Sequence, residues 1–375
     1  MNVASNGTWL LTALLALSAC GQEPKSTEPS TPAEETAMAP APSLEETLLP
    51  GVRLSVVESN GIRLRVAEMG EGPVVLLAHG WPESWYSWRH QLAALAEAGY
   101  RAVAPDMRGY GGSDAPEDVN AYDVVTLAAD MVGILDALGV ERAVMVGHDW
   151  GSPVAAHTVL LHPDRFRALV LMSVPHGGRG PTNPMDGMRQ NFGDNFFYML
   201  YHNEPGGVAE AEYDANVRDF LFRIYQSPNS PRQPPEVTDP KRSAGGWIVR
   251  IGEPLGLPDW LTEADLDYYV SQFEAAGFRG GLNYYRNIGR NWELTAALAD
   301  ARIEVPTLFV AGAQDLVIGG ASKDDLQAMM ADTVPDLRGV VLLPGVGHWV
   351  QQEAADATNA AVLAFLAELD APDSP

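Results

Sequence analysis

Short apolar runs alternate with amphipathic stretches along most of the chain, from about residue 53 to residue 369. Compact apolar runs bounded by turn residues predict buried strands, whereas apolar positions three and four residues apart predict helices. The pattern predicts strands over 63–68, 74–79, 101–105, 143–147, 168–173, 307–311 and 340–343, and helices over 86–98, 124–138, 152–161 and 354–369. Because strands and helices alternate, we expect an α/β fold with a mostly parallel sheet and helices on both faces.

Between about residues 175 and 292 the pattern changes. Aromatic-rich segments with helical spacing replace the alternation, and a proline cluster interrupts them at Pro228, Pro231, Pro234, Pro235 and Pro240. Since strand-like runs resume at residue 307, we interpret this stretch as a helical insertion. The predicted core is therefore 51–175 together with 293–371, and the predicted lid is 176–292.

The N-terminal segment has a different composition. An apolar run over 9–17 is followed by Leu17-Ser18-Ala19-Cys20. The run has the length of a signal-peptide core and is too short to span a bilayer. The segment resembles a bacterial lipoprotein signal over 1–20, which implies an exported protein whose Cys20 is lipidated and anchored to a membrane, facing the periplasm. Plain secretion and a mistaken start site stay open, because residues 1–8 contain no Lys or Arg.

Composition sets further bounds. Residues 21–50 hold six prolines among Glu, Ser, Thr and Ala, which predicts a disordered tether. Cys20 is the single cysteine of the chain, so no internal disulfide can form. At 375 residues and 46% hydrophobic content the chain can bury a large core. A formal net charge of −25 repels polyanions and argues against nucleic-acid binding.

The sharpest motif is Gly147-His148-Asp149-Trp150-Gly151, which stands between a predicted strand and a predicted helix. Glycines on either side permit a tight turn that raises the central residue at the carboxyl end of the sheet. The helix N-terminus and the N–H of Trp150 can stabilise negative charge there. Asp149 is therefore the candidate nucleophile. The alternative is that Asp149 only caps the helix expected from Ser152.

Three further positions fit the same chemistry. Trp81 follows the strand 74–79 in His79-Gly80-Trp81-Pro82, where its N–H can serve as a second oxyanion donor. Asp315 follows the strand 307–311, and His348 follows the strand 340–343. Nucleophile, acid and histidine in this order are typical of the α/β-hydrolase fold. We expect Asp315 to orient the imidazole of His348, which acts as the general base.

An aspartate in place of a serine changes the substrates that the site can attack. A carboxylate can open an epoxide or an alkyl halide by displacement at sp³ carbon, which leaves an alkyl ester on the enzyme. Water activated by His348 can then hydrolyse the ester. No metal or other cofactor is expected, because His148 has no second ligand at a suitable spacing.

Three motifs carry a family resemblance: the segments 79–89, 147–151 and 277–287 resemble soluble epoxide hydrolases of the α/β-hydrolase superfamily. The resemblance covers about residues 53 to 369. It implies the α/β-hydrolase fold with an inserted helical lid, and a small apolar epoxide and water as substrates. It also implies that Tyr198 and Tyr285, in the lid, donate to the epoxide oxygen.

Two other functions remain open at this point. A haloalkane dehalogenase would use Asp149 in the same way, although its first oxyanion loop commonly reads His-Gly-Asn-Pro, whereas Trp81 occupies that position here. It would also leave the two tyrosines without a role. The other possibility is a lipid-anchored binding protein on a hydrolase fold that has lost its chemistry.

Overall fold

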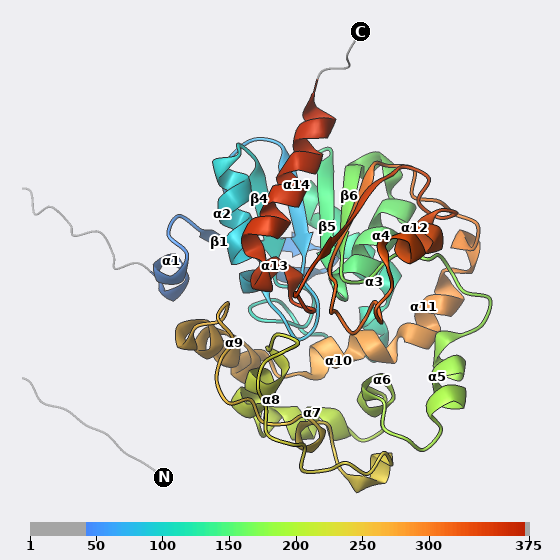
Figure 1. The fold of residues 1–375 in the computed structure, drawn as a ribbon. Helices are drawn as coiled ribbons and strands as arrows, with labels where there is room; N and C mark the ends of the chain where they lie inside the picture. The colour runs from blue at the N-terminus through green and yellow to red at the C-terminus, as the bar shows by residue number, and fades with distance from the viewer. Residues whose placement is uncertain (1–42, 372–375) are drawn as a thin grey trace, which may run out of the picture. The chain divides into compact units, whose positions relative to one another are not determined.

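One eight-stranded sheet forms the centre of the fold in a computed structural model of the protein, which describes residues 43–371 (Figure 1). The strand order is β1-β2-β4-β3-β5-β6-β7-β8. Strands β1 and β2 pair antiparallel, β2 pairs antiparallel with β4, and the remaining pairs are parallel. The strands are β1 (Arg53–Ser59), β2 (Ile62–Met69), β3 (Val74–Ala78), β4 (Arg101–Pro105), β5 (Ala143–His148), β6 (Phe166–Met172), β7 (Thr307–Gly312) and β8 (Leu337–Leu343). The predicted mostly parallel sheet is confirmed.

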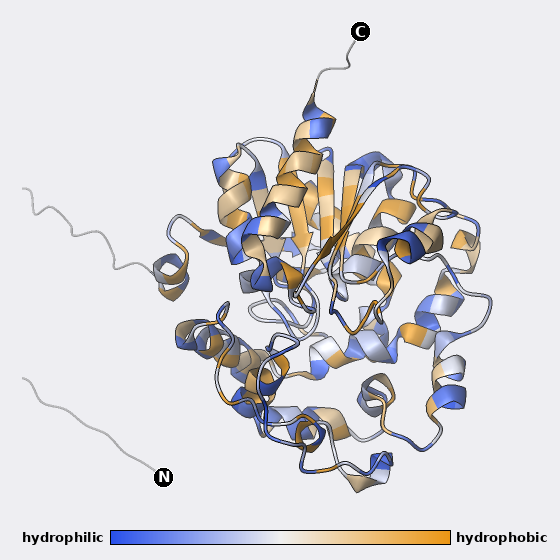
Figure 2. Ribbon diagram, in the orientation of Figure 1, coloured by the Kyte–Doolittle hydropathy of each residue, from blue (hydrophilic) through white to orange (hydrophobic). Residues whose placement is uncertain are grey.

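Helices cover both faces of the sheet. On one face α2 (Arg89–Glu97) packs with α14 (Ala355–Asp370), and on the other α3 (Val124–Ala137) packs with α4 (Gly151–Leu161). Every residue of β3 and β5 is buried, and the central strands are orange in the hydropathy view of Figure 2. Strands covered on both faces need such continuous apolar runs, which is why the sequence made them easy to predict. Two shorter helices complete the core, α12 (Lys323–Met330) and α13 (Val350–Glu353).

The structure differs from the sequence prediction in three places. The edge strand β1 was not predicted, because exposed polar residues break its apolar pattern. The predicted helix over 86–98 begins as a 3-10 turn, η1 (Trp85–Trp88), before α2. The predicted tether was too long at its end, since α1 (Leu44–Leu48) forms within it. Ser43 caps α1 by accepting from the N–H of Glu46, and acidic residues in the first turn suit the helix dipole.

The predicted signal peptide over 1–20, with Cys20, lies outside the described residues, as does most of the predicted tether. Within residues 43–371, every helix is too short or too polar to cross a membrane.

Seven α-helices lie between β6 and β7 and gather beyond the carboxyl ends of the parallel strands (Figure 1). They are α5 (Pro184–Phe192), α6 (Tyr198–His202), α7 (Val208–Asp214), α8 (Val217–Ile224), α9 (Glu263–Ala276), α10 (Arg279–Arg286) and α11 (Ile288–Leu294). Hydrogen bonds fasten this lid to the core. The hydroxyl of Tyr225 donates to the carbonyl of Pro82, and that of Tyr86 donates to Asp265 at 2.7 Å. The lid therefore has a fixed position over the strand ends.

Candidate active site

Asp149 stands on a sharp turn between β5 and α4. Its φ is +48°, in the left-handed region that few residues other than glycine adopt. A Cβ at Gly147 would overlap the carbonyl of Gly151, and a Cβ at Gly151 would overlap that of Ala78, so both positions require glycine. Asp149 Oδ1 accepts from the N–H of Trp81 at 2.8 Å. Since the residue before α4 is Trp150, this geometry contradicts the helix-cap alternative.

Three strand ends bring Asp149, Asp315 and His348 together. His348 Nε2 lies 3.4 Å from Asp149 Oδ2, and His348 Nδ1 lies 3.0 and 3.1 Å from the two oxygens of Asp315. The Asp315 side chain is fully buried, and its Oδ1 also accepts from the N–H of Val317 at 2.8 Å. The imidazole is thus held between two carboxylates, with one nitrogen donating to Asp315 and the other facing Asp149.

The charges in this arrangement shift two pKa values. Burial tends to lower the pKa of His348, but Asp315 and Asp149 outweigh it and hold the pKa well above 6.5. Burial tends to raise the pKa of Asp315, but the interaction with His348 holds it below its usual value. The His348–Asp315 pair therefore favours an imidazolium beside a carboxylate.

A second histidine–carboxylate pair lies behind this one, between Glu83 and His148. Glu83 accepts from the N–H of Gly80, from His148 Nδ1 and from Gln351 Nε2, each at 2.8 Å. His148 Nε2 donates to the backbone carbonyl of His348, also at 2.8 Å. Burial tends to raise the pKa of Glu83, but His148 outweighs it and the pKa falls to about 2. These buried bonds join the Trp81 loop, the turn at Asp149 and the His348 loop.

Sequence reasoning missed Glu83 and gave His148 no role beyond excluding a metal. The available signal was the position of Glu83 directly after Pro82 in the first oxyanion loop. Within residues 43–371, no group of three or more His, Cys, Asp or Glu side chains is arranged to hold a metal ion.

The two candidate tyrosines face each other from α6 and α10. The rings of Tyr198 and Tyr285 lie 5.9 Å apart in a T-shaped arrangement, and Trp150 packs edge-on against Tyr285 at 5.1 Å. Burial, reinforced by the nearby charge of Asp149, raises the pKa of both phenols. Both are therefore protonated at neutral pH. The neighbouring Tyr201 packs instead against Phe196 and Tyr213.

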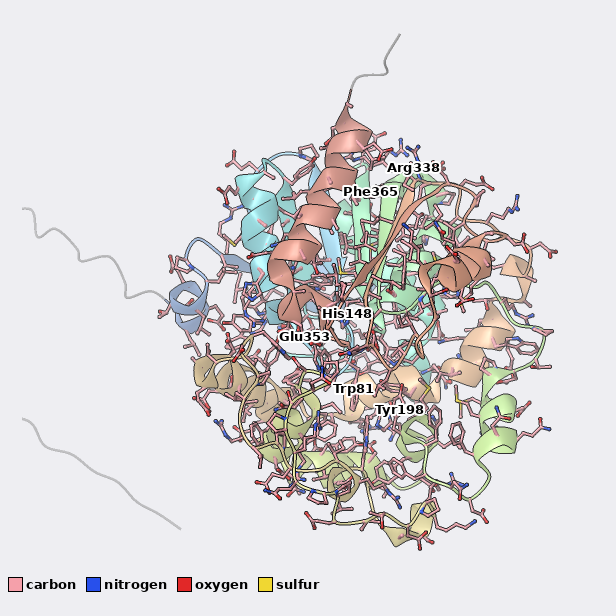
Figure 3. The ribbon with its side chains drawn as sticks, viewed as in Figure 1. Trp81, His148, Tyr198, Arg338, Glu353 and Phe365 are labelled. Atoms are coloured by element: carbon pink, nitrogen blue, oxygen red, sulfur yellow. The ribbon has the colours of Figure 1, made fainter. Side chains whose placement is uncertain are left out.

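A pocket of about 380 Å³ lies between Asp149 and the two tyrosines. Asp149, Trp150, Tyr198 and Tyr285 line it together with an apolar set that includes Pro153, Leu160, Val174, Pro175, Met188, Met199, Ile288 and Leu298. In Figure 3, His148 lies at the end of the sheet, and Trp81 and Tyr198 lie below it toward the lid. Phe365 and Arg338 lie at the opposite end of the sheet. The apolar lining of the pocket suits a mainly apolar substrate.

Known proteins share this architecture. Residues 73–355 match the family model described as alpha/beta hydrolase fold. Epoxide hydrolase A of Mycobacterium tuberculosis is 47% identical over 321 residues, which cover 84% of this chain and 97% of the relative. Epoxide hydrolase 1 of Siraitia grosvenorii is 42% identical over 323 residues, which cover 83% and 97% of the two chains.

Solved structures agree. The crystal structure of epoxide hydrolase A from Mycobacterium thermoresistibile has a TM-score of 0.76 and 46% identity, and the match covers 84% of this chain and 98% of that chain. The predicted α/β-hydrolase fold is confirmed, and the chain is an enzyme that belongs to the epoxide hydrolases of the α/β-hydrolase superfamily.

Proposed function

We propose that this enzyme hydrolyses an epoxide to a vicinal diol through a covalent alkyl ester on Asp149. One observation carries the proposal: the Asp149 carboxylate shares a pocket with two protonated phenols while lying 3.4 Å from His348 Nε2. A nucleophile, an acid for the leaving oxygen and a base for water are thus within reach of one bound molecule. The names of the relatives support the same reaction.

The first half of the reaction forms the ester. Asp149 Oδ1 stays bound to the N–H of Trp81, and Oδ2 attacks an oxirane carbon. A new C–O bond forms as the ring C–O bond breaks, and the resulting alkoxide takes a proton from the phenol of Tyr198 or Tyr285. The tyrosine remains as a phenolate and takes up a proton again later in the cycle.

The second half hydrolyses the ester. His348 Nε2 takes a proton from water, and the hydroxide attacks Asp149 Cγ while the N–H groups of Trp81 and Trp150 hold the charge on Oδ1. The Cγ–Oδ2 bond then breaks, and the departing diol oxygen takes the proton from His348. The regenerated carboxylic acid of Asp149 returns a proton to the phenolate, so the cycle consumes one epoxide and one water.

Ester formation also prepares the base. In the free enzyme Asp149 is one of the two carboxylates that raise the pKa of His348. The ester carries no charge, so this contribution disappears and the imidazole gives up its proton more readily. Asp315 remains to orient the ring and to stabilise the imidazolium that forms when water is deprotonated.

Trapping the ester tests the proposal. The variant His348→Gln incubated with a neutral aryl epoxide is expected to gain the mass of one substrate, located by peptide mapping on Asp149. The variant Asp149→Ala is expected to gain no mass and to form no diol. Diol formation by Asp149→Ala, or the absence of an adduct in His348→Gln while the native enzyme turns over, contradicts the ester mechanism.

The other two functions make different predictions for the same samples. A haloalkane dehalogenase would release a halide ion and a proton from a haloalkane, the proton being detected by a pH indicator, and would form no diol from epoxides. A binding protein without chemistry would be protected against thermal unfolding by epoxides without converting them. The two phenols beside Asp149 favour the epoxide, since halide departure needs no proton.

We also propose that the protein is exported and held to a membrane by lipid on Cys20. The apolar run over 9–17 and the Leu-Ser-Ala-Cys sequence support it. Intact-mass analysis of protein purified from detergent is expected to find an acylated N-terminus at Cys20. Cys20→Ser is expected to retain residues 1–19 and to lack the acyl mass. An unmodified mature terminus in the native protein contradicts the anchor.

A further inference from the structure

The mouth of the pocket is marked by those lining residues that solvent reaches. Most of the lining is shielded, and its exposed members are Gly177, Gly180, Pro184 and Val317. They belong to two segments of the chain. One is 174–184, which leads from β6 into α5, and the other is 316–322, which follows Asp315. These two segments therefore form the mouth.

Exposed apolar side chains surround this mouth. Leu316 is 94% exposed and Val317 is 45% exposed, and Met329 on α12 is 50% exposed. A Cβ at Gly177 would lie 3.2 Å from Cγ of Met329, so α12 packs directly against the first segment. The three side chains therefore belong to one continuous border of the mouth.

The border continues onto α11. Trp292 Nε1 donates to the carbonyl of Gly180 at 2.9 Å, which fastens the first segment to this helix. Leu294, two residues further along, is 43% exposed. We call the four side chains together the apolar rim: Leu294, Leu316, Val317 and Met329. Of the nine large apolar side chains exposed within residues 43–371, four thus lie at this mouth. Exposed apolar residues that are scattered singly are ordinary, whereas a cluster at an opening indicates a contact surface.

Charge is nearly absent from the two segments of the mouth. Residues 174–184 and 316–322 contain one charged side chain, Arg179, although 19% of the whole chain is charged and its net charge is −25. Within a strongly acidic protein the mouth is therefore a locally neutral, apolar surface. Such a surface suits an apolar partner better than a charged one.

The proposed lipid on Cys20 points to the partner. The 22 residues 21–42 separate Cys20 from the described chain, and fully extended they reach about 75 Å. In Figure 1, α1 and α12 lie on opposite sides of the domain, whose expected diameter is about 50 Å. The reach exceeds this diameter, so an anchored domain can turn the apolar rim toward the bilayer. Attachment also raises the local concentration, which favours a contact that is weak by itself.

We propose that the apolar rim docks on the lipid bilayer that holds the anchor, with Leu316 and Met329 in the boundary between head groups and acyl chains. The inference rests on the proposed anchor at Cys20. Docking places Gly177 and Val317, which line the pocket, against lipid, so that a molecule dissolved in the bilayer enters the pocket without crossing water. Because the contact is apolar, it is insensitive to ionic strength. Zwitterionic lipid suits it better than anionic lipid, which the net charge of −25 repels.

Coupling the protein to vesicles tests the docking. Protein that begins at Cys20, the single cysteine of the chain, is coupled through its thiol to a maleimide-bearing lipid in phosphatidylcholine vesicles. Hydrogen exchange measured by mass spectrometry then compares coupled with uncoupled protein. Peptides over 174–184 and 316–330 are expected to exchange at least about threefold more slowly in the coupled protein, at low and at high salt alike. Peptides over β1, which carries the exposed Val56, are expected to keep their exchange rate.

Variants locate the contact. Leu316→Ser combined with Met329→Gln removes two apolar side chains from the lipid and is expected to lose most of the protection. The matched control combines Val208→Ser with Leu255→Gln. These two side chains are 46% and 62% exposed, and both lie outside the apolar rim and the pocket lining. The control is expected to keep the full protection.

The outcomes separate this inference from the proposed function. Equal exchange with and without coupling, unchanged protection in the rim variant, or an equal loss in the control overturns the docking and leaves epoxide hydrolysis and the anchor standing. A dimer of the uncoupled protein that sedimentation detects and the rim variant abolishes also overturns it, because a second copy then covers the rim. An unmodified terminus in the native protein overturns the anchor and this inference with it. Thermal unfolding verifies that each variant is folded, and Leu316→Ser alone decides the matter if the double variant is not.

Discussion

Two histidine–carboxylate pairs lie side by side beneath the lid, yet the structure gives them different tasks. The rings of His148 and His348 are 4.9 Å apart, and each donates through Nδ1 to a buried carboxylate, Glu83 at 2.8 Å and Asp315 at 3.0 Å. They differ at the other nitrogen. His148 Nε2 donates to a backbone carbonyl, whereas His348 Nε2 faces Asp149, which lines the pocket.

This difference decides which pair can move protons. The His148 side chain is fully buried, and both of its nitrogens are engaged in bonds that hold loops together. The His348 side chain is 21% exposed, so one nitrogen can meet water or substrate. A histidine bound to a carboxylate can therefore serve either as a structural support or as a general base. What its second nitrogen faces decides between the two roles.

The largest effect is expected when either His348 or the nucleophile Asp149 that it faces is replaced. His348→Gln removes the base that activates water, and Asp149→Ala removes the nucleophile, so we expect kcat for diol formation to fall by at least about 10⁴-fold in each. The stability of Asp149→Ala should change little, whereas His348→Gln is expected to be less stable than the native enzyme, because it leaves the buried carboxylate of Asp315 without its imidazolium partner. Initial rates together with thermal unfolding measure this. A loss of activity that parallels a loss of folding would assign these residues a structural task instead.

The second-largest effect is a loss of stability, expected when the buried pair Glu83–His148 is broken. Glu83→Gln leaves His148 without its carboxylate in a buried site, and breaking such a pair lowers the free energy of unfolding by about 3 kcal/mol. The pKa of Glu83 in the folded protein, about 2, lies below the ordinary glutamate value of 4.5. The stability that Glu83 contributes is therefore present above pH 4.5 and is lost as the pH falls toward 2.

Urea unfolding of the native enzyme and Glu83→Gln at several pH values measures this contribution. The difference between the two is expected to be largest near neutral pH and to narrow between pH 4.5 and pH 2. Asp186→Asn serves as a control, because this exposed residue pairs only with a neighbour on its own helix. A difference that stays constant with pH would show that the charge of Glu83 is not what stabilises the fold.

The two pairs were not equally predictable from the sequence. A strand that the sequence shows as an apolar run precedes each of Asp149, Asp315 and His348. The carboxyl ends of parallel strands lie at one edge of the sheet. Their meeting could therefore be anticipated. The hydrogen bonds of Glu83 reach partners 65 and 268 residues away, and nothing local to Glu83 specifies them.

The pH dependence of ester hydrolysis tests whether the charge of Asp149 raises the pKa of His348. This half-reaction requires neutral His348, so its rate is expected to rise about tenfold per pH unit below the pKa of His348 and then to level off. Since the ester has lost the charge of Asp149, the midpoint should lie below the pKa of His348 in the free enzyme. Stopped-flow tryptophan fluorescence, with Trp150 beside the ester, can follow single turnovers.

A titration of the free enzyme by NMR supplies the reference for that midpoint. If the two values coincide, Asp149 is not one of the charges that raise the pKa of His348, and the proposed release of the base by ester formation is wrong. His148 provides the internal comparison, because its two nitrogens are occupied in both states. Its NMR signals should be insensitive to ester formation if it serves only as a support.

The smallest loss of activity is expected when one of the two tyrosines is replaced. This loss should affect a different step of the reaction from the one that depends on His348. Tyr285→Phe or Tyr198→Phe removes one phenol while the other still donates to the alkoxide, so ester formation should slow by about tenfold in each single variant and by more in the double variant. Ester hydrolysis should keep its rate, because the proton that it needs is moved by His348. Burst measurements distinguish the two steps, since a slower first step reduces the ester that accumulates, whereas a defect at His348 increases it. A single variant that slows hydrolysis and ester formation equally would place its tyrosine among the groups that position Asp149 rather than among the proton donors.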